Sequence, residues 1–282
     1  MVKKYGVIGY PIGHTMSPFI HTELFKLRNF SGEYGKFQIS PEELGNEFEN
    51  TLKKLDGFNV TIPHKVAIIK HLDRLDDSAA EYGAVNVVAN INGEYVGYNT
   101  DAYGFLAGLR INKIELKGNV LVYGYGGAAR TIIAEAFKAG CSVTIGTTEQ
   151  FSEGAKPIAD ELGKKFGKEI KILTDEEIVN RYDLLVNATP LGMYPKVEAM
   201  PLSEDKLSLF DAVYDIVYNP EETKLLATCK KMGKKCGGGL SMLVAQAAKA
   251  HEYFYGVKFD ENEVLAVIEK TAKEQEAIFC GK

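Results

Sequence analysis

The stretch V-L-V-Y-G-Y-G-G-A-A-R, residues 120–130, decides the fold of this chain. A short apolar run ends in glycines at 124, 126 and 127, and helix-favouring residues begin at Ala128. A strand, a glycine turn and a helix start in this order predict a βα unit that binds a dinucleotide. The glycines permit a tight turn close to a pyrophosphate, and the helix N-terminus offers free N–H groups to its charge. A plain tight βα turn could have the same sequence, so the rest of the chain must decide.

Before and after this stretch, apolar runs of strand length alternate with helical patterns, which predicts an α/β fold with mostly parallel sheets. Asn92-Gly93 between two strand-like runs predicts a hairpin. Ser17-Pro18 predicts an N-cap followed by proline at the first helical position. We expect the other strands at 5–10, 34–39, 57–61, 120–123, 141–145, 170–173, 183–188, 211–216 and 234–236. We expect the helices to include 41–55, 102–110, 131–137, 221–232, 241–255 and 261–279.

The βαβ run from 118 to 236 is long enough to form a domain of its own. We therefore expect two α/β domains with a cleft between them: residues 1–104, completed by C-terminal helices 240–282, and a Rossmann-like, doubly wound domain at 105–239.

Composition excludes several classes of function. The chain has 282 residues, a net charge of −5 and no basic block, so it has nothing to attract nucleic acid or an anionic membrane. The N-terminus turns glycine-rich before a signal-peptide core could form, and no apolar run has membrane-spanning length. Cys141, Cys229, Cys236 and Cys280 lack metal-ligand spacing, and we interpret them as buried or incidental thiols. We expect a cytoplasmic protein without a metal.

Polar clusters sit where predicted strands or helices begin or end, which is where α/β proteins bind ligands. Each has a purely structural alternative: Ser17 and Asp101 could cap helices, Asn59 and Asn86 could satisfy turn backbone, and Lys65 and Gln246 could face water. The clusters are His14–Ser17, Asn59–Lys65, Asn86, Asn99–Asp101 and Gly239–Gln246.

A series of motifs runs in one order along nearly the whole chain. They are G-Y-P-I-G-H-T-M-S-P, N-V-T-I-P-H-K, G-A-V-N, G-Y-N-T-D, G-Y-G-G-A-A-R, N-A-T-P-L-G-M, D-I-V-Y-N-P and G-G-L-S-M-L-V-A-Q-A. With these motifs the chain closely and very specifically resembles the shikimate dehydrogenase family, whose NADP-linked enzymes interconvert 3-dehydroshikimate and shikimate in chorismate and aromatic amino-acid biosynthesis.

The resemblance implies a role for each matching position. Lys65 matches the catalytic lysine and Asp101 the carboxylate paired with it, and the first domain would bind the substrate while the second binds NADP. The positions that match substrate contacts are Thr15, Ser17, Asn59, Thr61, Asn86, Tyr218 and Gln246. The positions implied to contact the cofactor are Gly124, Gly126, Gly127, Ala128, Thr147, Thr148, Asn187, Thr189, Leu191, Met193 and Gly239. Thr15 stands where the family usually has serine, so the pocket for the substrate carboxylate would be slightly smaller.

These residue types suit the chemistry. Oxidation of a ring alcohol sends a hydride to nicotinamide and releases the hydroxyl proton, which requires one proton-transfer group within hydrogen-bond reach of the oxygen. Lys65 can fill this role without metal. Burial would lower the lysine pKa and Asp101 would raise it, so the sequence leaves the protonation state of Lys65 open.

The strand end that should meet the ribose departs from the family. The usual Asn-Arg-Thr is Gly146-Thr147-Thr148 here, and no acidic residue stands at the strand end to repel a 2′-phosphate. Two threonine hydroxyls, a helix N-terminus and Lys156 still favour an anion, so we expect NADP to be preferred by a reduced margin, with NAD possible.

Two rival functions stay open from the sequence. One is a quinate/shikimate dehydrogenase with relaxed use of NAD and NADP. The other is a non-catalytic nucleotide-binding sensor, against which the presence of both Lys65 and Asp101 argues. The sequence is compatible with a monomer or a homodimer.

Overall fold

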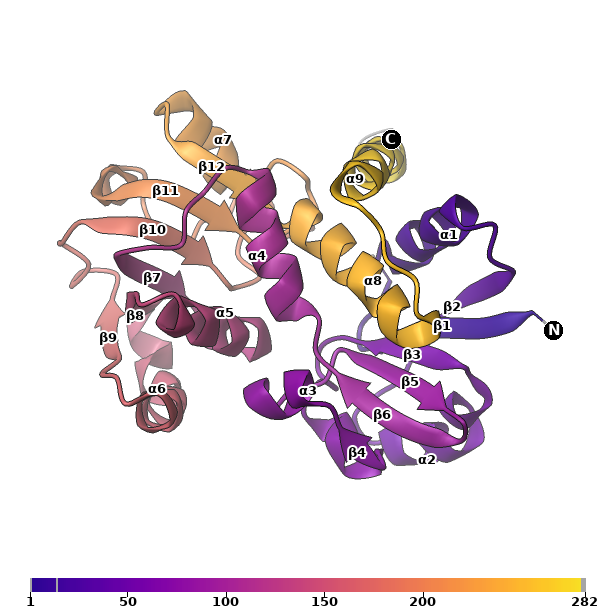
Figure 1. Ribbon diagram of the computed structural model, residues 1–282. Coiled ribbons are helices and arrows are strands. Elements are labelled where there is room, and N and C mark those ends of the chain that lie inside the picture. Colours follow the sequence, from indigo (N-terminus) through magenta and orange to yellow (C-terminus); the bar gives the residue numbers. More distant parts are fainter. Residues whose placement is uncertain (1, 14, 280–282) are drawn as a thin grey trace. The chain divides into compact units, whose positions relative to one another are not determined.

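The computed structural model describes residues 2–13 and 15–279, and the chain divides into two compact units (Figure 1). The first unit comprises Met1–Gly104 and Val244–Glu274, and the second comprises Phe105–Leu243 and Gln275–Lys282. His14 and Cys280 lie outside the described residues.

The first unit is built on a six-stranded sheet with the order β2-β1-β3-β5-β6-β4. Its strands are β1 Lys3–Gly9, β2 Gly32–Gln38, β3 Gly57–Val60, β4 Arg74–Leu75, β5 Val87–Ile91 and β6 Glu94–Tyr98. β1 pairs in parallel with β2 and β3, whereas β5 pairs antiparallel with β3 and β6. The predicted hairpin is confirmed, with φ of 55° at Asn92 and 94° at Gly93. β4 pairs in parallel with β6, so the hairpin makes this sheet mixed, but most of its strand pairs are parallel, as predicted.

Helices cover both faces of this sheet. Alternate residues of β1 enter different cores: Tyr5 packs with Phe25 and Phe254, and Ile8 packs with Phe48 and Phe58. The helices concerned are α1 Ser17–Leu27, α2 Leu44–Asn50, α3 Asp77–Tyr82 and α8 Gly239–Tyr255, with 3₁₀ turns at Leu52–Lys54 and Ala67–His71. α9 Glu261–Phe279 contacts the α1 segment through the ion pairs of Glu263 with Arg28 and of Lys270 with Glu23.

Two of the predicted helix features are wrong. The N-cap of α1 is Met16 rather than Ser17, and no side chain caps the helix. The helix predicted over 41–55 is shorter, because α2 ends at Asn50 and a 3₁₀ turn follows.

The second unit contains a six-stranded sheet in which every pair is parallel. The strands are β7 Asn119–Tyr123, β8 Ser142–Thr147, β9 Lys171–Thr174, β10 Tyr182–Asn187, β11 Phe210–Asp215 and β12 Lys235–Gly238. Their order is β12-β11-β10-β7-β8-β9, so the direction of winding reverses between β7 and β10. This is the Rossmann strand order, and the predicted doubly wound fold is confirmed.

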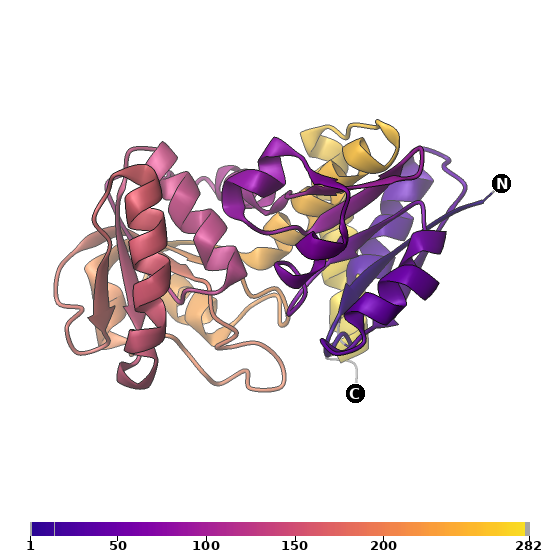
Figure 2. The ribbon, with the colours of Figure 1, turned by 90° about the horizontal axis from the view of Figure 1, so that it is seen from below.

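Helices pack on both faces of the second sheet as well (Figures 1 and 2). Val120 and Val122 point toward α5 Gly127–Lys138 and α6 Ser152–Phe166, and Leu121 and Tyr123 point toward α7 Lys224–Lys231. The remaining elements are α4 Asp101–Ile111 and 3₁₀ turns at Glu149–Phe151 and Asp205–Leu209. Within the described residues, no helix is both long and apolar enough to cross a membrane.

Candidate active site

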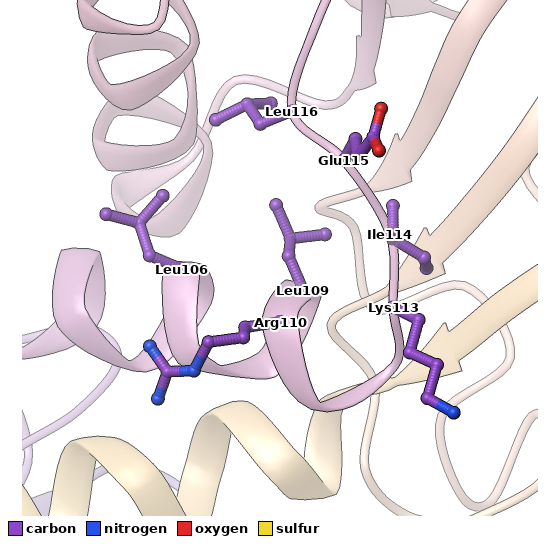
Figure 3. Close-up of a pocket in the computed structure, with 7 residues that line it drawn as sticks. All are labelled: Leu106, Leu109, Arg110, Lys113, Ile114, Glu115 and Leu116. Carbon is purple, nitrogen blue, oxygen red and sulfur yellow. The ribbon is translucent and has the colours of Figure 1, made fainter.

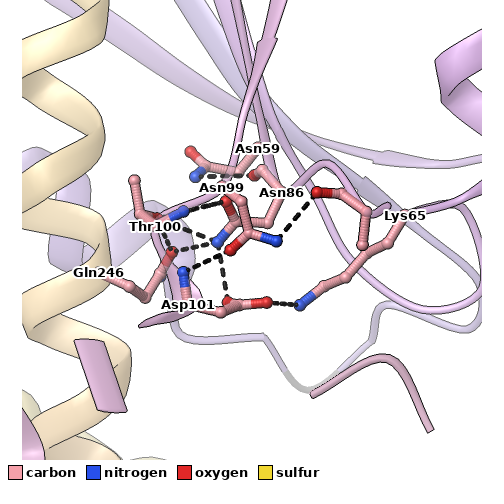
Figure 4. Close-up of polar contacts among 8 residues, drawn as sticks. Asn59, Lys65, Asn86, Asn99, Thr100, Asp101 and Gln246 are labelled. Atoms are coloured by element: carbon pink, nitrogen blue, oxygen red, sulfur yellow. Dashed lines mark hydrogen bonds and ion pairs between the residues drawn. The ribbon is translucent and has the colours of Figure 1, made fainter. Parts of the chain in front are cut away.

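An ion pair lies where the loop after β3 meets the start of α4. Lys65 Nζ is 2.6 Å from Asp101 Oδ2, and the two side chains are 17% and 7% exposed (Figure 4). A carboxylate this buried needs compensating partners. The lysine supplies a positive charge, and Asn86 Nδ2 donates to the other carboxylate oxygen at 2.8 Å.

Asn86 joins segments that are far apart in sequence. Its Oδ1 accepts from the backbone N–H of Thr100 at 2.7 Å, and its Nδ2 also lies 3.2 Å from Gln246 Oε1 on α8. Thr100 Oγ1 donates to the same Gln246 oxygen at 3.2 Å. The side chain of Asn86 thus satisfies backbone and orients Asp101 at once, and Gln246 does not simply face water (Figure 4).

Asn59 stands near the end of β3, beside this network. Its Nδ2 lies 3.4 Å from the backbone oxygen of Asn86, and its Oδ1 accepts from the Tyr34 hydroxyl at 2.7 Å. Sequence reasoning missed Tyr34, because a tyrosine in a strand pattern carries no signal of a polar partner two strands away.

Thr15, Ser17 and Thr61 belong to the same unit. Thr15 Oγ1 donates to Ser17 Oγ at 3.1 Å and accepts from Ser17 N–H at 3.2 Å. The Ser17 side chain does not cap α1, so the capping interpretation of this residue is wrong. Thr61 follows β3, and its N–H donates to the backbone oxygen of Ile8.

Tyr218 belongs to the second unit, just beyond β11. Its backbone oxygen accepts from Gln275 Nε2 at 2.6 Å. Burial raises the pKa of its phenol.

The glycine loop has the geometry that a phosphate cradle needs. Gly124 has φ +107°, and a Cβ there would lie 2.7 Å from Thr189 Cγ2, so a side chain has no room. Gly126 is the N-cap of α5, and a Cβ added there would meet no atom within 4 Å. The start of α5 therefore lies open at the point where the strand order reverses.

The loop after β10 is organised by Asn187. Asn187 Oδ1 accepts from Thr189 N–H at 3.1 Å and from Thr189 Oγ1 at 2.7 Å. Thr189 Oγ1 in turn accepts from Leu191 N–H at 3.2 Å. Met193 in the same loop is 42% exposed.

Asp215 stabilises this loop through hydrogen bonds to its carboxylate. It ends β11, is fully buried, and accepts from Thr223 Oγ1 at 2.6 Å, Asn187 Nδ2 at 2.9 Å and Val217 N–H at 3.1 Å. Burial raises the pKa of the carboxyl from 3.8 to about 6, against the opposing effect of these hydrogen bonds. The sequence signal that could have found Asp215 is a charged residue that closes an otherwise apolar strand.

Three other positions predicted to contact the cofactor, Gly239, Thr147 and Thr148, differ in packing and in hydrogen bonding. A Cβ at Gly239 would lie 2.1 Å from the Ile216 oxygen, so backbone packing alone requires glycine there. Thr147 ends β8 and is 4% exposed, and within the described chain the buried Thr148 hydroxyl lacks a hydrogen-bond partner. Lys156 pairs with Glu153 at 2.5 Å.

A pocket of about 440 Å³ lies elsewhere in the second unit, at the end of α4 (Figure 3). It is lined by Leu106, Leu109, Arg110, Lys113, Ile114, Glu115 and Leu116. This lining shares no residue with the predicted sites, and the polar chemistry points to the Lys65 cluster and the glycine loop instead.

Metal ligands are not grouped anywhere in residues 2–13 and 15–279. Cys141, Cys229 and Cys236 are free thiols.

Comparison with known proteins agrees with this geometry. Residues 7–88 match the family model described as the shikimate dehydrogenase substrate binding domain. The NADP(+) shikimate dehydrogenase of Shouchella clausii is 40% identical over 263 residues, which cover 92% of this chain and 94% of that protein. The corresponding protein of Methanocaldococcus jannaschii is 39% identical over 279 residues, 96% of this chain and 98% of that one. A crystal structure of shikimate 5-dehydrogenase from Thermus thermophilus with NADP(H) and shikimate superposes with a TM-score of 0.84 at 31% identity, covering 95% of this chain and 99% of that one.

Proposed function

The chain belongs to the shikimate dehydrogenase family, and on that premise we propose that it catalyses the reversible, NADP-dependent reduction of 3-dehydroshikimate to shikimate in aromatic amino-acid biosynthesis. The observation that carries the proposal is the Lys65–Asp101 ion pair within a buried amide network. A nucleotide-binding sensor needs neither residue.

Lys65 is the proton-transfer residue in this proposal. An ammonium group has three N–H donors, and Asp101 takes one of them, so Lys65 can also donate to a substrate carbonyl oxygen. In the reducing direction the lysine supplies the proton that the new hydroxyl needs, and in the oxidising direction it takes that proton back. Asp101 holds the amine in place, and Asn86 holds Asp101. Fixing these groups before substrate arrives is what makes proton transfer efficient.

The side chains proposed to bind the substrate ring belong to the first unit, as Lys65 does. Asn59, Thr61, Asn86 and Gln246 offer amide and hydroxyl groups suited to a polyhydroxylated ring, and Thr15 and Ser17 offer paired hydroxyls to its carboxylate. Tyr218 is the proposed substrate contact of the second unit.

The second unit has the features of an NADP site. Gly124, Gly126, Gly127 and the first turn of α5 would hold the pyrophosphate of NADP, which when bound would supply the hydride chemistry. The fit rests on the left-handed Gly124 and on the open space above Gly126. Asn187, Thr189, Leu191, Met193 and Gly239 would line the nicotinamide end, and Thr147 with the unpartnered Thr148 hydroxyl would meet the ribose end. We accordingly assign the first unit to substrate binding and the second to the cofactor.

The test is a set of initial rates with shikimate and quinate, each with NADP and NAD, alongside Lys65→Ala. We expect the highest kcat/KM for shikimate with NADP. A higher kcat/KM for quinate would identify a quinate enzyme instead. Retained NADP binding without turnover of either alcohol would identify a sensor.

A further inference from the structure

Tyr34 contacts the candidate active site at Asn59, which lies two strands away in the same sheet. In the order β2-β1-β3, Tyr5 pairs with both Tyr34 and Gly57, and Val7 pairs with Asn59. Side chains two residues apart on a strand share a face, so Tyr34 and Asn59 lie on the same face of the sheet. Because neighbouring strands are about 4.8 Å apart, only a long side chain can cross β1. The Tyr34 hydroxyl does so, and it donates to Asn59 Oδ1 at 2.7 Å.

This hydrogen bond determines which way the Asn59 amide faces. The backbone oxygen of Asn86 can only accept, so the amide atom 3.4 Å from it is Nδ2. Oδ1 therefore faces Tyr34, whose hydroxyl must be the donor. A primary amide has two N–H donors, and Asn86 takes at most one of them. The other is available to a ligand.

The Tyr34 ring is supported directly by a ring of α1, which is in turn held by a residue of α8. The ring of His21 on α1 stacks on it with centroids 4.0 Å apart and planes 9° from parallel. His21 is fully buried, and its Nδ1 is 2.8 Å from Nε2 of His251 on α8. The other ring nitrogen of His251 contacts the Tyr255 hydroxyl. Burial lowers the pKa of both histidines, so the rings that support Tyr34 are neutral near pH 7.

We propose that Tyr34 is a positioning residue, whose hydroxyl holds the Asn59 amide so that one N–H donor is presented to a ring hydroxyl of the substrate. Tyr34 acts through Asn59 and does not touch the substrate. The inference rests on the proposed function, since it takes Asn59 to be a ligand of shikimate. A preset amide has less motion to lose when substrate binds.

Tyr34→Phe tests this, because it keeps the stacked ring and removes only the hydroxyl. We expect the KM for shikimate to rise about 2- to 12-fold, the effect of one neutral hydrogen bond. The kcat and the KM for NADP should stay within about twofold, because neither proton transfer nor the second unit is changed. Tyr95→Phe is the matched control, since its hydroxyl also contacts an asparagine, Asn90, and donates to the Lys53 oxygen at 2.7 Å. The control should lower the melting temperature without raising the KM.

A double-mutant cycle separates positioning from general support of the fold. In an Asn59→Ala background, Tyr34→Phe should raise the KM no further, because the group it positions is gone. If the two effects on KM multiply independently, or if Tyr34→Phe alone leaves KM unchanged, the inference is overturned. Asn59→Ser replaces Asn59→Ala if circular dichroism shows the alanine variant unfolded. A wild type that does not oxidise shikimate removes the proposed function together with the inference, whereas an active wild type with a normal Tyr34→Phe removes the inference alone.

Discussion

Asp215 provides a test of the second unit that needs no ligand. The carboxyl is fully buried at the end of β11, and burial raises its pKa from 3.8 to about 6. The folded chain therefore keeps this proton to a higher pH than the unfolded chain does. The resulting stabilisation is fully present below pH 3.8 and is lost as pH rises through about 6. A pKa difference of this size corresponds to about 3 kcal/mol of unfolding free energy, of which about 2 kcal/mol falls between pH 4.5 and pH 7.5.

The hydrogen bonds of Asp215 indicate where the proton goes. Oδ2 faces Thr223 Oγ1 at 2.6 Å, and that hydroxyl also accepts from Leu226 N–H at 3.3 Å. A hydroxyl has two acceptor lone pairs, so protonated Oδ2 can donate to Thr223 while the Leu226 bond persists. The bonds from Asn187 and Val217 go to Oδ1 and remain. We therefore expect titration of Asp215 to change stability rather than the arrangement of the loop.

The assay is urea unfolding of wild type and Asp215→Asn at pH 4.5 and 7.5, followed by circular dichroism because the chain has no tryptophan. Asparagine cannot ionise, and with its oxygen in place of Oδ1 and its NH₂ in place of Oδ2 it keeps the bonds from Asn187 and Val217 and donates to Thr223, so it mimics the protonated acid at both pH values. The unfolding free energy of wild type relative to that of the variant should therefore fall by about 2 kcal/mol from pH 4.5 to pH 7.5. Asp211→Asn, exposed on the same strand, controls for the loss of one negative charge. A difference in unfolding free energy between wild type and Asp215→Asn that is equal at both pH values would refute the reasoning.

Three further predictions concern the proposed reaction. Lys65→Ala should lower kcat by about 10² to 10⁴ with little change in the KM for shikimate, because it removes the proton-transfer group; a kcat within about threefold of wild type, in a folded variant, would contradict the assignment. Ser17→Ala should raise the KM for shikimate roughly 10- to 150-fold by removing a hydrogen bond to the carboxylate, and because Ser17 does not cap α1 the melting temperature should change little; an unchanged KM excludes this role. Thr147→Arg should raise the ratio of kcat/KM for NADP over NAD by roughly 10- to 150-fold, since an arginine adds a bidentate contact to the 2′-phosphate. An unchanged ratio argues against Thr147 as the phosphate position, and a wild type that favours NAD tenfold or more would show the cofactor prediction to be wrong.

Local sequence determined the elements whose conformation is set within a few residues. Asn92-Gly93 specifies its hairpin because both positions need positive φ, and the observed values are 55° and 94°. Gly124 likewise marks the turn after β7. The doubly wound sheet follows from the alternation of apolar strands and helices, since parallel strands need crossover helices. Short elements were not predicted from the sequence. α3 has an Asp76 cap and a left-handed Gly83, but its six residues are too few for a periodic pattern.

The start of α1 could not be predicted correctly from the local sequence either. Serine before proline is a good N-cap pattern, yet α1 begins one residue earlier with Met16 as its cap. The hydroxyl of Ser17 instead lies beside that of Thr15. Residue type indicates that a hydroxyl can accept a hydrogen bond, but which donor reaches it depends on the path of the chain around it.

The sequence by itself established the family, the doubly wound unit and the identity of the polar residues that end its strands. Tertiary structure alone decided which polar side chains meet, including those of Tyr34 and Asp215, which the sequence did not single out. Gln246 contacts Asn86 from 160 positions away, Tyr34 reaches Asn59 across an intervening strand, and Asp215 joins two loops. Such contacts arise because buried polar groups must find hydrogen-bond partners, and those partners are set by sheet order and helix packing rather than by neighbours in the chain.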